Sequence, residues 1–247
     1  MTTHSEDMTT LSYSVPRVRA GWELPEEQMP QSELHVEVID LLSAILRYWA
    51  ARSGARIVRD LAVRWIEERP NVGVDPDLAV LVPSPPDEML TSLRTWQPGH
   101  APPLLAIEVV SDANPRKDYE IAPEKYAASG TQELVVFDPL LVGPKTHGGP
   151  ILLQVWRRDA RDRFTRVYSG GGPVRSHALD AYLVVTNDGR RLRVAKDAAA
   201  TDFWLTGEEA ASAAKEVERA AKEAALSAKE AALARVAELE AELARRR

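Results

Sequence analysis

The sequence predicts a mixed α/β domain followed by a long helical tail, and three observations lead to that prediction. Two short apolar runs bounded by Pro or Ser, residues 77–82 and 104–111, are typical of buried strands. A helical segment separates the second run from a third at residues 133–137, and we expect the two strands of such a unit to be parallel neighbours. About 40 residues after Gly207 contain neither Pro nor Gly, which favours one long helix.

The first part of the chain supplies one helix and short strands. Residues 1–20 are rich in Thr and Ser and lack periodicity, so we expect a disordered tail there. Ser32 is a good N-cap for a helix that runs to about Arg52 and that Gly54 closes. Residues 56–66 alternate loosely between apolar and polar side chains, which favours one or two strands.

Loops, a second helix and hairpins follow. The Pro-rich stretch of residues 83–103 is long for a loop inside a compact domain, and such loops are usually functional or well packed. A polar turn then leads into a helix predicted from about Asp118 to Ser129, with a glycine after it. From residue 151 the pattern changes to hairpins, one of which has an Asn-Asp-Gly turn at residues 187–189.

The C-terminal segment carries its own helix signals. Thr206 and Glu209 match a capping box, in which each residue bonds the backbone of the other. Ala-Lys-Glu then recurs at residues 214, 221 and 228, with a strict period of seven. Two interpretations remain open: a solvated helix, and a weak coiled coil that makes the protein a homo-oligomer.

Composition sets the size of the core and the number of parts. The chain has 247 residues and 45% hydrophobic content, enough for one sizeable core and an appendage. We therefore expect a disordered tail over residues 1–20, a folded domain over residues 21–205 and a helical tail over residues 206–247.

Composition also excludes several kinds of site. The absence of Cys excludes disulfides, thiolate metal sites and Cys nucleophiles. The polar N-terminus does not resemble a signal peptide and no run approaches the roughly 20 apolar residues of a membrane span, so we expect a soluble, cytoplasmic protein without a membrane partner. Because the net charge is −6, a nucleic-acid partner would need a local basic patch.

Two acids stand where strand patterns do not explain them. Glu108 has four apolar residues before it and two after it, and a buried carboxylate is costly without a partner or a metal. Asp77 opens the preceding apolar run, directly after Pro76. Two such acids at the ends of neighbouring strands would form an oxygen site for a divalent cation. The alternatives are a turn residue for Asp77 and a buried ion pair with an arginine for Glu108.

Arginines gather on the predicted hairpins. They could contact phosphate groups or protect edge strands by charge, and the sequence does not decide between the two. They are Arg157, Arg158, Arg161, Arg163 and Arg166 on one hairpin and Arg190, Arg191 and Arg193 on another.

Several motifs together resemble a known family. They are Pro76-Asp77, Glu108-Val109-Val110-Ser111, Asp118, Tyr126, Gly130 and the strand from Glu133 to Pro139. In their order and spacing they resemble the Uma-two family of restriction endonucleases, within the PD-(D/E)XK nuclease superfamily. The resemblance runs from about Trp22 to about residue 195. It implies a restriction-endonuclease-like fold, with a central mixed sheet flanked by helices.

The resemblance also implies a reaction. The expected activity is that of an endodeoxyribonuclease that hydrolyses phosphodiester bonds of DNA with metal-activated water. The expected cofactor is Mg²⁺ or Mn²⁺, held by Asp77, Glu108, the carbonyl of Val109 and water. His35 and Asp118 match positions that could assist, although a satisfied histidine and a helix N-cap are the simpler interpretations.

The sequence departs from the family pattern at the catalytic lysine. The superfamily position two after Glu108 is Val110, and the position used within the family is Ala122. Lys125 lies one helical turn beyond Ala122, and Lys117 lies at the helix entrance, so both are substitutes for it. A rival hypothesis follows: the chain is a catalytically inactive binding module with a nuclease fold, presented or oligomerised by its C-terminal helix.

Overall fold

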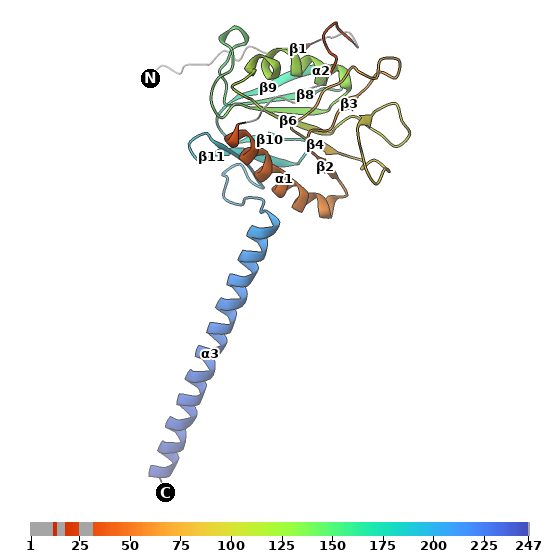
Figure 1. Cartoon of the computed structure of the whole chain (residues 1–247). Helices are drawn as coiled ribbons and strands as arrows, with labels where there is room; N and C mark the ends of the chain where they lie inside the picture. The colour runs from red at the N-terminus through yellow and green to blue at the C-terminus, as the bar shows by residue number, and fades with distance from the viewer. Residues whose placement is uncertain (1–11, 14–17, 25–31, 247) are drawn as a thin grey trace, which may run out of the picture. The chain divides into compact units, whose positions relative to one another are not determined.

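The computed structural model describes residues 12–13, 18–24 and 32–246, and the chain divides into two units, Met1–Trp204 and Leu205–Arg247 (Figure 1). Most of the predicted N-terminal tail lies outside the described residues. Within it, Ser12 and Tyr13 form a short strand, β1, that pairs antiparallel with residues 164–165.

A seven-stranded mixed sheet forms the centre of the described part of the first unit, in the order β1-β9-β8-β7-β6-β4-β2. Its strands are β1 (Ser12–Tyr13), β2 (Arg56–Val58), β4 (Leu78–Leu81), β6 (Leu105–Val109), β7 (Glu133–Phe137), β8 (Leu153–Arg158) and β9 (Phe164–Gly170). β6 and β7 are parallel, which confirms the predicted strand–helix–strand unit, while the other neighbouring pairs are antiparallel. The predicted fold class, a mixed α/β domain with a central mixed sheet flanked by helices, is confirmed.

The remaining elements form two smaller sheets and the helices. The short sheets are β3 (Val63–Arg64) with β5 (Leu93–Arg94), and β10 (Val174–Ser176) with β11 (Ala181–Thr186) and β12 (Arg191–Ala195). The helical elements are α1 (Glu33–Ser53), the π-helix η1 (Lys117–Ile121), α2 (Ala122–Ser129), the 3₁₀ turn η2 (Lys145–His147) and α3 (Gly207–Arg245).

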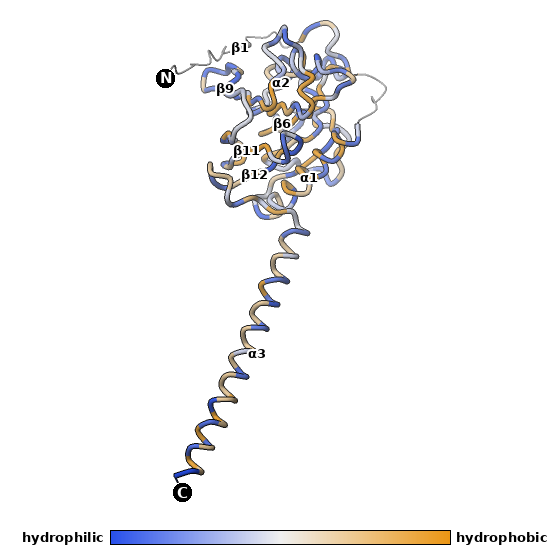
Figure 2. The backbone as a smooth tube through the Cα atoms, turned by 90° about the vertical axis from the view of Figure 1, so that its left-hand side faces the viewer, coloured by the Kyte–Doolittle hydropathy of each residue, from blue (hydrophilic) through white to orange (hydrophobic). Residues whose placement is uncertain are grey.

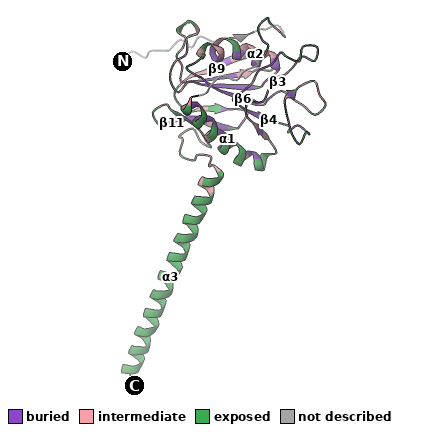
Figure 3. Cartoon of the chain, viewed as in Figure 1, coloured by how far each residue is buried: buried purple, intermediate pink, exposed green. Residues whose placement is uncertain are grey.

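The two faces of the central sheet bury two separate cores. Alternate residues of β6 point to opposite faces. Leu105 and Ile107 join the core that contains α1 and the β11–β12 hairpin. Ala106 joins the core that contains α2 and the β3–β5 ribbon. Figure 3 shows the central strands as the most buried part of the chain. The sheet is therefore covered on both faces, and a polar group in β6 has no route to bulk water through the sheet.

Sequence signals explain how α1 is positioned. The Ser32 side chain accepts a bond from the backbone N–H of His35, and Gly54 ends the helix with φ of 71°, in the left-handed region that glycine adopts without steric cost. Both predicted caps of this helix are confirmed. The N-cap fixes the first turn of α1, and with it the backbone of His35.

Three elements differ from their predicted form. Asp77 lies just before β4 rather than within it. The predicted helix from Asp118 is a π-helix followed by α2, because Pro123 begins the regular turns and the preceding segment holds an extra residue per turn. The Pro-rich loop of residues 83–103 contains β5, a strand too short for the sequence pattern to reveal.

The second unit consists mainly of α3, whose predicted capping box is present at Thr206 and Glu209. None of its described residues is buried, and apolar side chains such as Leu226 and Leu233 are exposed. Figure 2 shows polar and apolar residues interspersed along this helix. Its coiled-coil association stays a prediction. Within the described ranges, no helix combines the length and the apolar character needed to cross a membrane.

Candidate active site

The two acids singled out in the sequence lie together at one end of β6. β4 and β6 are antiparallel with Leu78 paired to Ile107, so continuing this register by one residue sets Asp77 opposite Glu108. The backbone N–H of Val109 donates a 2.7 Å hydrogen bond to Asp77 Oδ2. This bond ties the end of β6 to the residue before β4, and it leaves the other oxygen of Asp77 for a different partner.

Glu108 is a fully buried acid with one unsatisfied oxygen. Its side chain is on the face that α2 covers, and Tyr126 of α2 donates a 2.5 Å hydrogen bond to Oε1. Oε2 has no hydrogen-bond donor, and its nearest cation is Lys117 Nζ at 3.8 Å. Burial, with the charge of Asp77 adding to it, raises the pKa of Glu108 from 4.5 to about 7, although Lys117 and Tyr126 act in the opposite direction.

The expected alternative for Glu108, a buried ion pair with an arginine, is wrong for the described residues. The cation within ion-pair distance is a lysine, and it is nearly half exposed. The charge of Glu108, followed by those of the neighbouring aspartates, raises the pKa of Lys117 above its ordinary value. Lys117 is therefore a fully protonated cation at neutral pH, with its ammonium group at the entrance to the buried acid.

The π-helix presents both Lys117 and Asp118 to this site. Its wider turn closes with a bond from the N–H of Ala122 to the carbonyl of Lys117. Asp118 is 3% exposed, and its Oδ1 has no hydrogen-bond donor and lies 3.9 Å from Lys117 Nζ. Burial and then the charge of Glu108 raise the pKa of Asp118. The N-cap interpretation of Asp118 is wrong, since the N-cap is Arg116 and has no side-chain capping bond.

His35 reaches the site from the first turn of α1. Its Nε2 lies 3.4 Å from Asp77 Oδ1, and both ring nitrogens are buried without a hydrogen-bond partner. A buried ring nitrogen without a partner is costly. Nε2 has its contact with Asp77, whereas Nδ1 has no partner among the described residues, so the simpler interpretation of a fully satisfied histidine is not supported.

Lys125, the other candidate lysine, is brought near the site but not into contact. Among the described residues it makes no ion pair or hydrogen bond with Asp77, Glu108 or Asp118. Burial, and then the neighbouring charge of Lys117, lowers the pKa of Lys125. It is a half-buried second cation beside the first.

Three residues around the pair have a larger role than the sequence alone indicates. Tyr126 matches the family pattern in the sequence, and in the structure its hydroxyl donates a hydrogen bond to Glu108. Asp75 is half-buried, and burial raises its pKa while Lys117, Arg64 and Lys125 lower it. Asp60 also has a raised pKa, caused first by partial burial and then by Asp77. The acid-rich stretch of Asp75 and Asp77 was a usable signal, whereas nothing in the sequence connected Asp60 to it.

The donors at this site suit a hard divalent cation. Glu108 and Asp118 each have a buried carboxylate oxygen without a hydrogen-bond donor, and burial, followed by neighbouring like charges, raises the pKa of both groups. Such excess negative charge is what a cation with oxygen ligands would offset. In the described part of the chain, no three His, Asp or Glu side chains converge on one ion position. A cation here would thus take at most two carboxylates, with backbone and water oxygens, as Mg²⁺ often does.

Several arginines of the hairpins have structural partners. Arg157 pairs with Glu133 at 3.0 Å, Arg158 donates to the carbonyl of Ala127 and Arg193 donates to the carbonyl of Trp204. Contact with phosphate would require these groups to share or break bonds that hold the fold together. These three arginines are therefore weaker candidates for phosphate contact than the exposed Arg161, Arg190 and Arg191 of the same hairpins.

Comparison with known proteins gives the family. A search of curated proteins finds no match. One solved structure that resembles the chain is a "putative nuclease belonging to DUF820" from Anabaena variabilis, with 17% identity, a TM-score of 0.42, and coverage of 62% of this chain and 76% of that one. The family model Uma2, described as "Putative restriction endonuclease", matches residues 23–166, more than half of the chain. The chain belongs to the Uma2 family of restriction endonuclease-like proteins.

Proposed function

We propose that this protein is a Mg²⁺-dependent endonuclease that hydrolyses phosphodiester bonds of DNA, with Mn²⁺ as a substitute ion. The observation that carries the proposal is the buried pair Asp77–Glu108 with the ammonium of Lys117 3.8 Å from the free carboxylate oxygen. A buried acid with a raised pKa beside a charged partner, as Glu108 is, is typical of functional sites. Membership of the Uma2 family supports the same class of reaction.

Asp77, Glu108 and the carbonyl of Val109 would hold the ion. When bound, it would lower the pKa of a water molecule and offset charge on the scissile phosphate. The protein sets the orientation of both acids in advance. Tyr126 fixes Oε1 of Glu108 and the N–H of Val109 fixes Oδ2 of Asp77, so one oxygen of each acid remains available. His35 lies against the remaining oxygen of Asp77 and would orient it or donate to a phosphate.

Lys117 takes the role of the lysine that Val110 and Ala122 do not supply. Its ammonium group would stabilise negative charge that develops on the phosphate, which is the main contribution a protein makes to phosphoryl transfer. Because its pKa is raised, Lys117 remains charged and does not act as a base. Helical spacing favoured Lys125 for this role, but the ion-pair distances favour Lys117.

Cleavage of supercoiled plasmid in Mg²⁺, in Mn²⁺ and in EDTA tests the proposal. We expect nicked and linear products with either ion and none in EDTA. Glu37, an exposed acid of α1, provides the matched control, since Glu37→Gln should cleave like the wild type. A protein that cuts no DNA with either ion, while binding DNA or remaining folded, would contradict the proposal.

One observation favours the alternative, a catalytically inactive nuclease-fold binding module. The positions at which the family pattern calls for lysine hold Val110 and Ala122. The module would be presented or oligomerised by α3, whose apolar side chains Leu226, Leu233 and Val236 are exposed and suit a weak coiled coil. Light scattering of the whole chain and of a Leu233→Glu variant distinguishes an oligomer, whose mass falls in the variant, from a monomer, whose mass does not change.

A further inference from the structure

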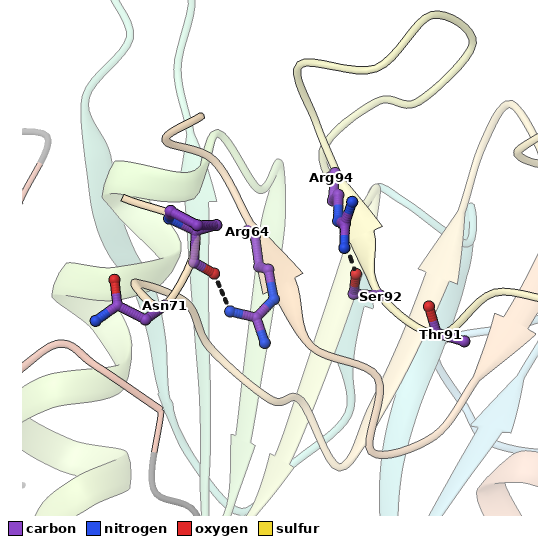
Figure 4. A pocket seen from close by; sticks show the side chains of 6 residues that line it. Arg64, Asn71, Thr91, Ser92 and Arg94 are labelled. Atoms are coloured by element: carbon purple, nitrogen blue, oxygen red, sulfur yellow. Dashed lines mark hydrogen bonds between the residues drawn. The ribbon is translucent and has the colours of Figure 1, made fainter. Parts of the chain in front are cut away.

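A pocket at the β3–β5 ribbon gathers hydrogen-bond donors that no role above uses. It has a volume of about 440 Å³. Its lining is Arg64, Pro70, Asn71, Thr91, Ser92 and Arg94. Figure 4 shows the side chains of Arg64 and Arg94 in the middle, with Asn71 on the side of Arg64 and Ser92 and Thr91 on the side of Arg94. Guanidinium, hydroxyl and amide groups are the side chains that most often contact phosphate oxygens.

The two arginines are held side by side by the fold. In the parallel pair β3–β5, Arg64 and Arg94 are Cα partners, and so are their neighbours Val63 and Leu93. Val63 and Leu93 are completely buried and anchor the ribbon in the core beneath α2. Because side chains alternate along a strand, the arginines point away from that core. The buried pair Val63–Leu93 thus holds the positively charged Arg64 and Arg94 next to each other.

Burial raises the pKa of Asp75 and the charge of Arg64 acts against that rise, but within the described ranges no carboxylate pairs directly with either arginine. Arg64 donates to the carbonyl of Pro70 and Arg94 Nε donates to Ser92 Oγ at 3.3 Å, and neither guanidinium forms an ion pair. Most of their N–H donors therefore remain available. Like charges on paired strand positions destabilise a sheet, whereas an anion between them would stabilise it.

The ribbon is bonded to the segment that leads into the site. Val63 and Val74 exchange backbone hydrogen bonds of 2.8 and 3.1 Å. Val74 is three residues before Asp77, a stretch that spans at most about 11 Å. Phosphates follow one another along a DNA strand with a rise of about 3.4 Å. A duplex with its scissile phosphate near Asp77 would therefore bring neighbouring phosphates within reach of Arg64.

We propose that the Arg64–Arg94 pocket binds a backbone phosphate of duplex DNA next to the phosphate that is cut. This inference rests on the proposed function, because it assigns the pocket to the same substrate. The pocket would position the strand without reading its sequence, since phosphate contacts carry no base information. It also supplies the local basic patch that a chain with net charge −6 needs in order to bind nucleic acid.

The test is DNA binding without cleavage, measured by fluorescence anisotropy of a labelled duplex oligonucleotide in Ca²⁺ and in EDTA. We expect Arg94→Gln to weaken binding at least about fivefold and to lower the slope of log affinity against log salt by about 1. The loss of affinity should be the same for two duplexes of unrelated sequence. Arg47→Gln, which removes an exposed arginine of α1, is the matched control and should bind like the wild type.

A second variant guards against a purely structural effect. Arg64→Gln removes the bond to Pro70 as well, so its thermal unfolding is measured together with its binding. Arg94→Gln binding that equals wild-type binding overturns the inference, as does a wild type that binds inorganic phosphate at the pocket but not the duplex. Reduced binding in Arg94→Gln supports it even when the wild type cuts no DNA, in which case only the proposed function fails.

Discussion

Glu108 and Glu133 are both buried acids on neighbouring parallel strands, yet their surroundings differ. Glu133, at the start of β7, accepts bonds from the Ser176 hydroxyl, the His177 N–H at 2.9 Å and Arg157 at 3.0 Å. Glu108, toward the end of β6, accepts one bond from Tyr126 and keeps an oxygen without a donor.

The hydrogen bonds of these two acids distinguish a structural acid from a candidate catalytic one. Both are almost completely buried, so burial does not distinguish them. Glu133 has used its oxygens on donors within the protein, whereas Glu108 has an oxygen left for something that is not part of the chain. Its place at the carboxyl end of a parallel strand is also where open α/β sheets bind their ligands. Bonding of the individual oxygens, rather than burial, identifies the functional group.

The largest effect should come from Glu108→Gln. Loss of the charge that holds the ion should lower DNA cleavage by at least about a thousandfold, or about 4 kcal/mol of transition-state stabilisation. The folded protein should persist, since an amide of the same shape replaces a carboxyl group that burial already disfavours in its charged form. Plasmid cleavage and thermal unfolding measure the two properties. Unchanged DNA cleavage by this variant would show that Glu108 is not part of the active site.

Glu133→Gln should show the reverse pattern. It weakens the pairing with Arg157 and leaves one donor unmatched, which should cost about 2 kcal/mol of unfolding free energy, because Arg157 is partly exposed. Cleavage per folded molecule should remain that of the wild type. Urea denaturation gives the stability. A Glu133 variant that is stable but does not cleave DNA would show that Glu133, too, acts in the reaction.

Lys117→Ala should lower cleavage at least about tenfold, about 1.4 kcal/mol, and Lys125→Ala should lower it less. Since the charge of Lys117 lowers the pKa of Glu108, its removal should also shift the acid limb of the pH profile to higher pH. Lys145, an exposed lysine of the turn η2, provides the control. A larger loss of cleavage in Lys125→Ala than in Lys117→Ala would show that Lys125, and not Lys117, has the proposed role.

The smallest effect concerns pH and stability. The pKa of Glu108 is about 7 in the folded protein against an ordinary 4.5, so between these values the folded state keeps a proton that the unfolded chain has released. Stability from this group is then present at low pH and lost as pH rises through that window. In EDTA, the Tm of Glu108→Gln relative to the wild type should rise by a few degrees from pH about 5 to about 7. A difference that does not change with pH would contradict the raised pKa.

The sequence was sufficient to single out Glu108 as a buried acid, because an acid within an apolar run needs a partner whatever the fold. It was also sufficient for the parallel pair β6–β7 and for both caps of α1, since these depend on local patterns. It could not tell Glu108 from Glu133, because Ser176, which satisfies Glu133, is 43 residues away along the chain. Tertiary contacts decide which acid is satisfied.

The two lysines show a second limit of sequence reasoning. Helical spacing placed Lys125 near the position of Ala122, on the assumption of 3.6 residues per turn. That spacing holds in α2, but the sequence does not reveal the π-helix of residues 117–121, which carries Lys117 to within 3.8 Å of Glu108. The ribbon β3–β5 was missed for a similar reason, since strands of two residues have no period to detect.

The π-helix also has a consequence for how such chains can be aligned and altered. One turn of it holds an extra residue compared with an α-helix, so loss of one residue between Lys117 and Ile121 could be absorbed by conversion to regular helix. That deletion would leave Lys117 pointing in nearly the same direction relative to Tyr126, because a wide turn with one more residue completes about the same rotation as a regular turn. A spacing motif counted across this segment is therefore one position longer than in a regular helix, although the side chains before and after the wide turn keep their relative directions.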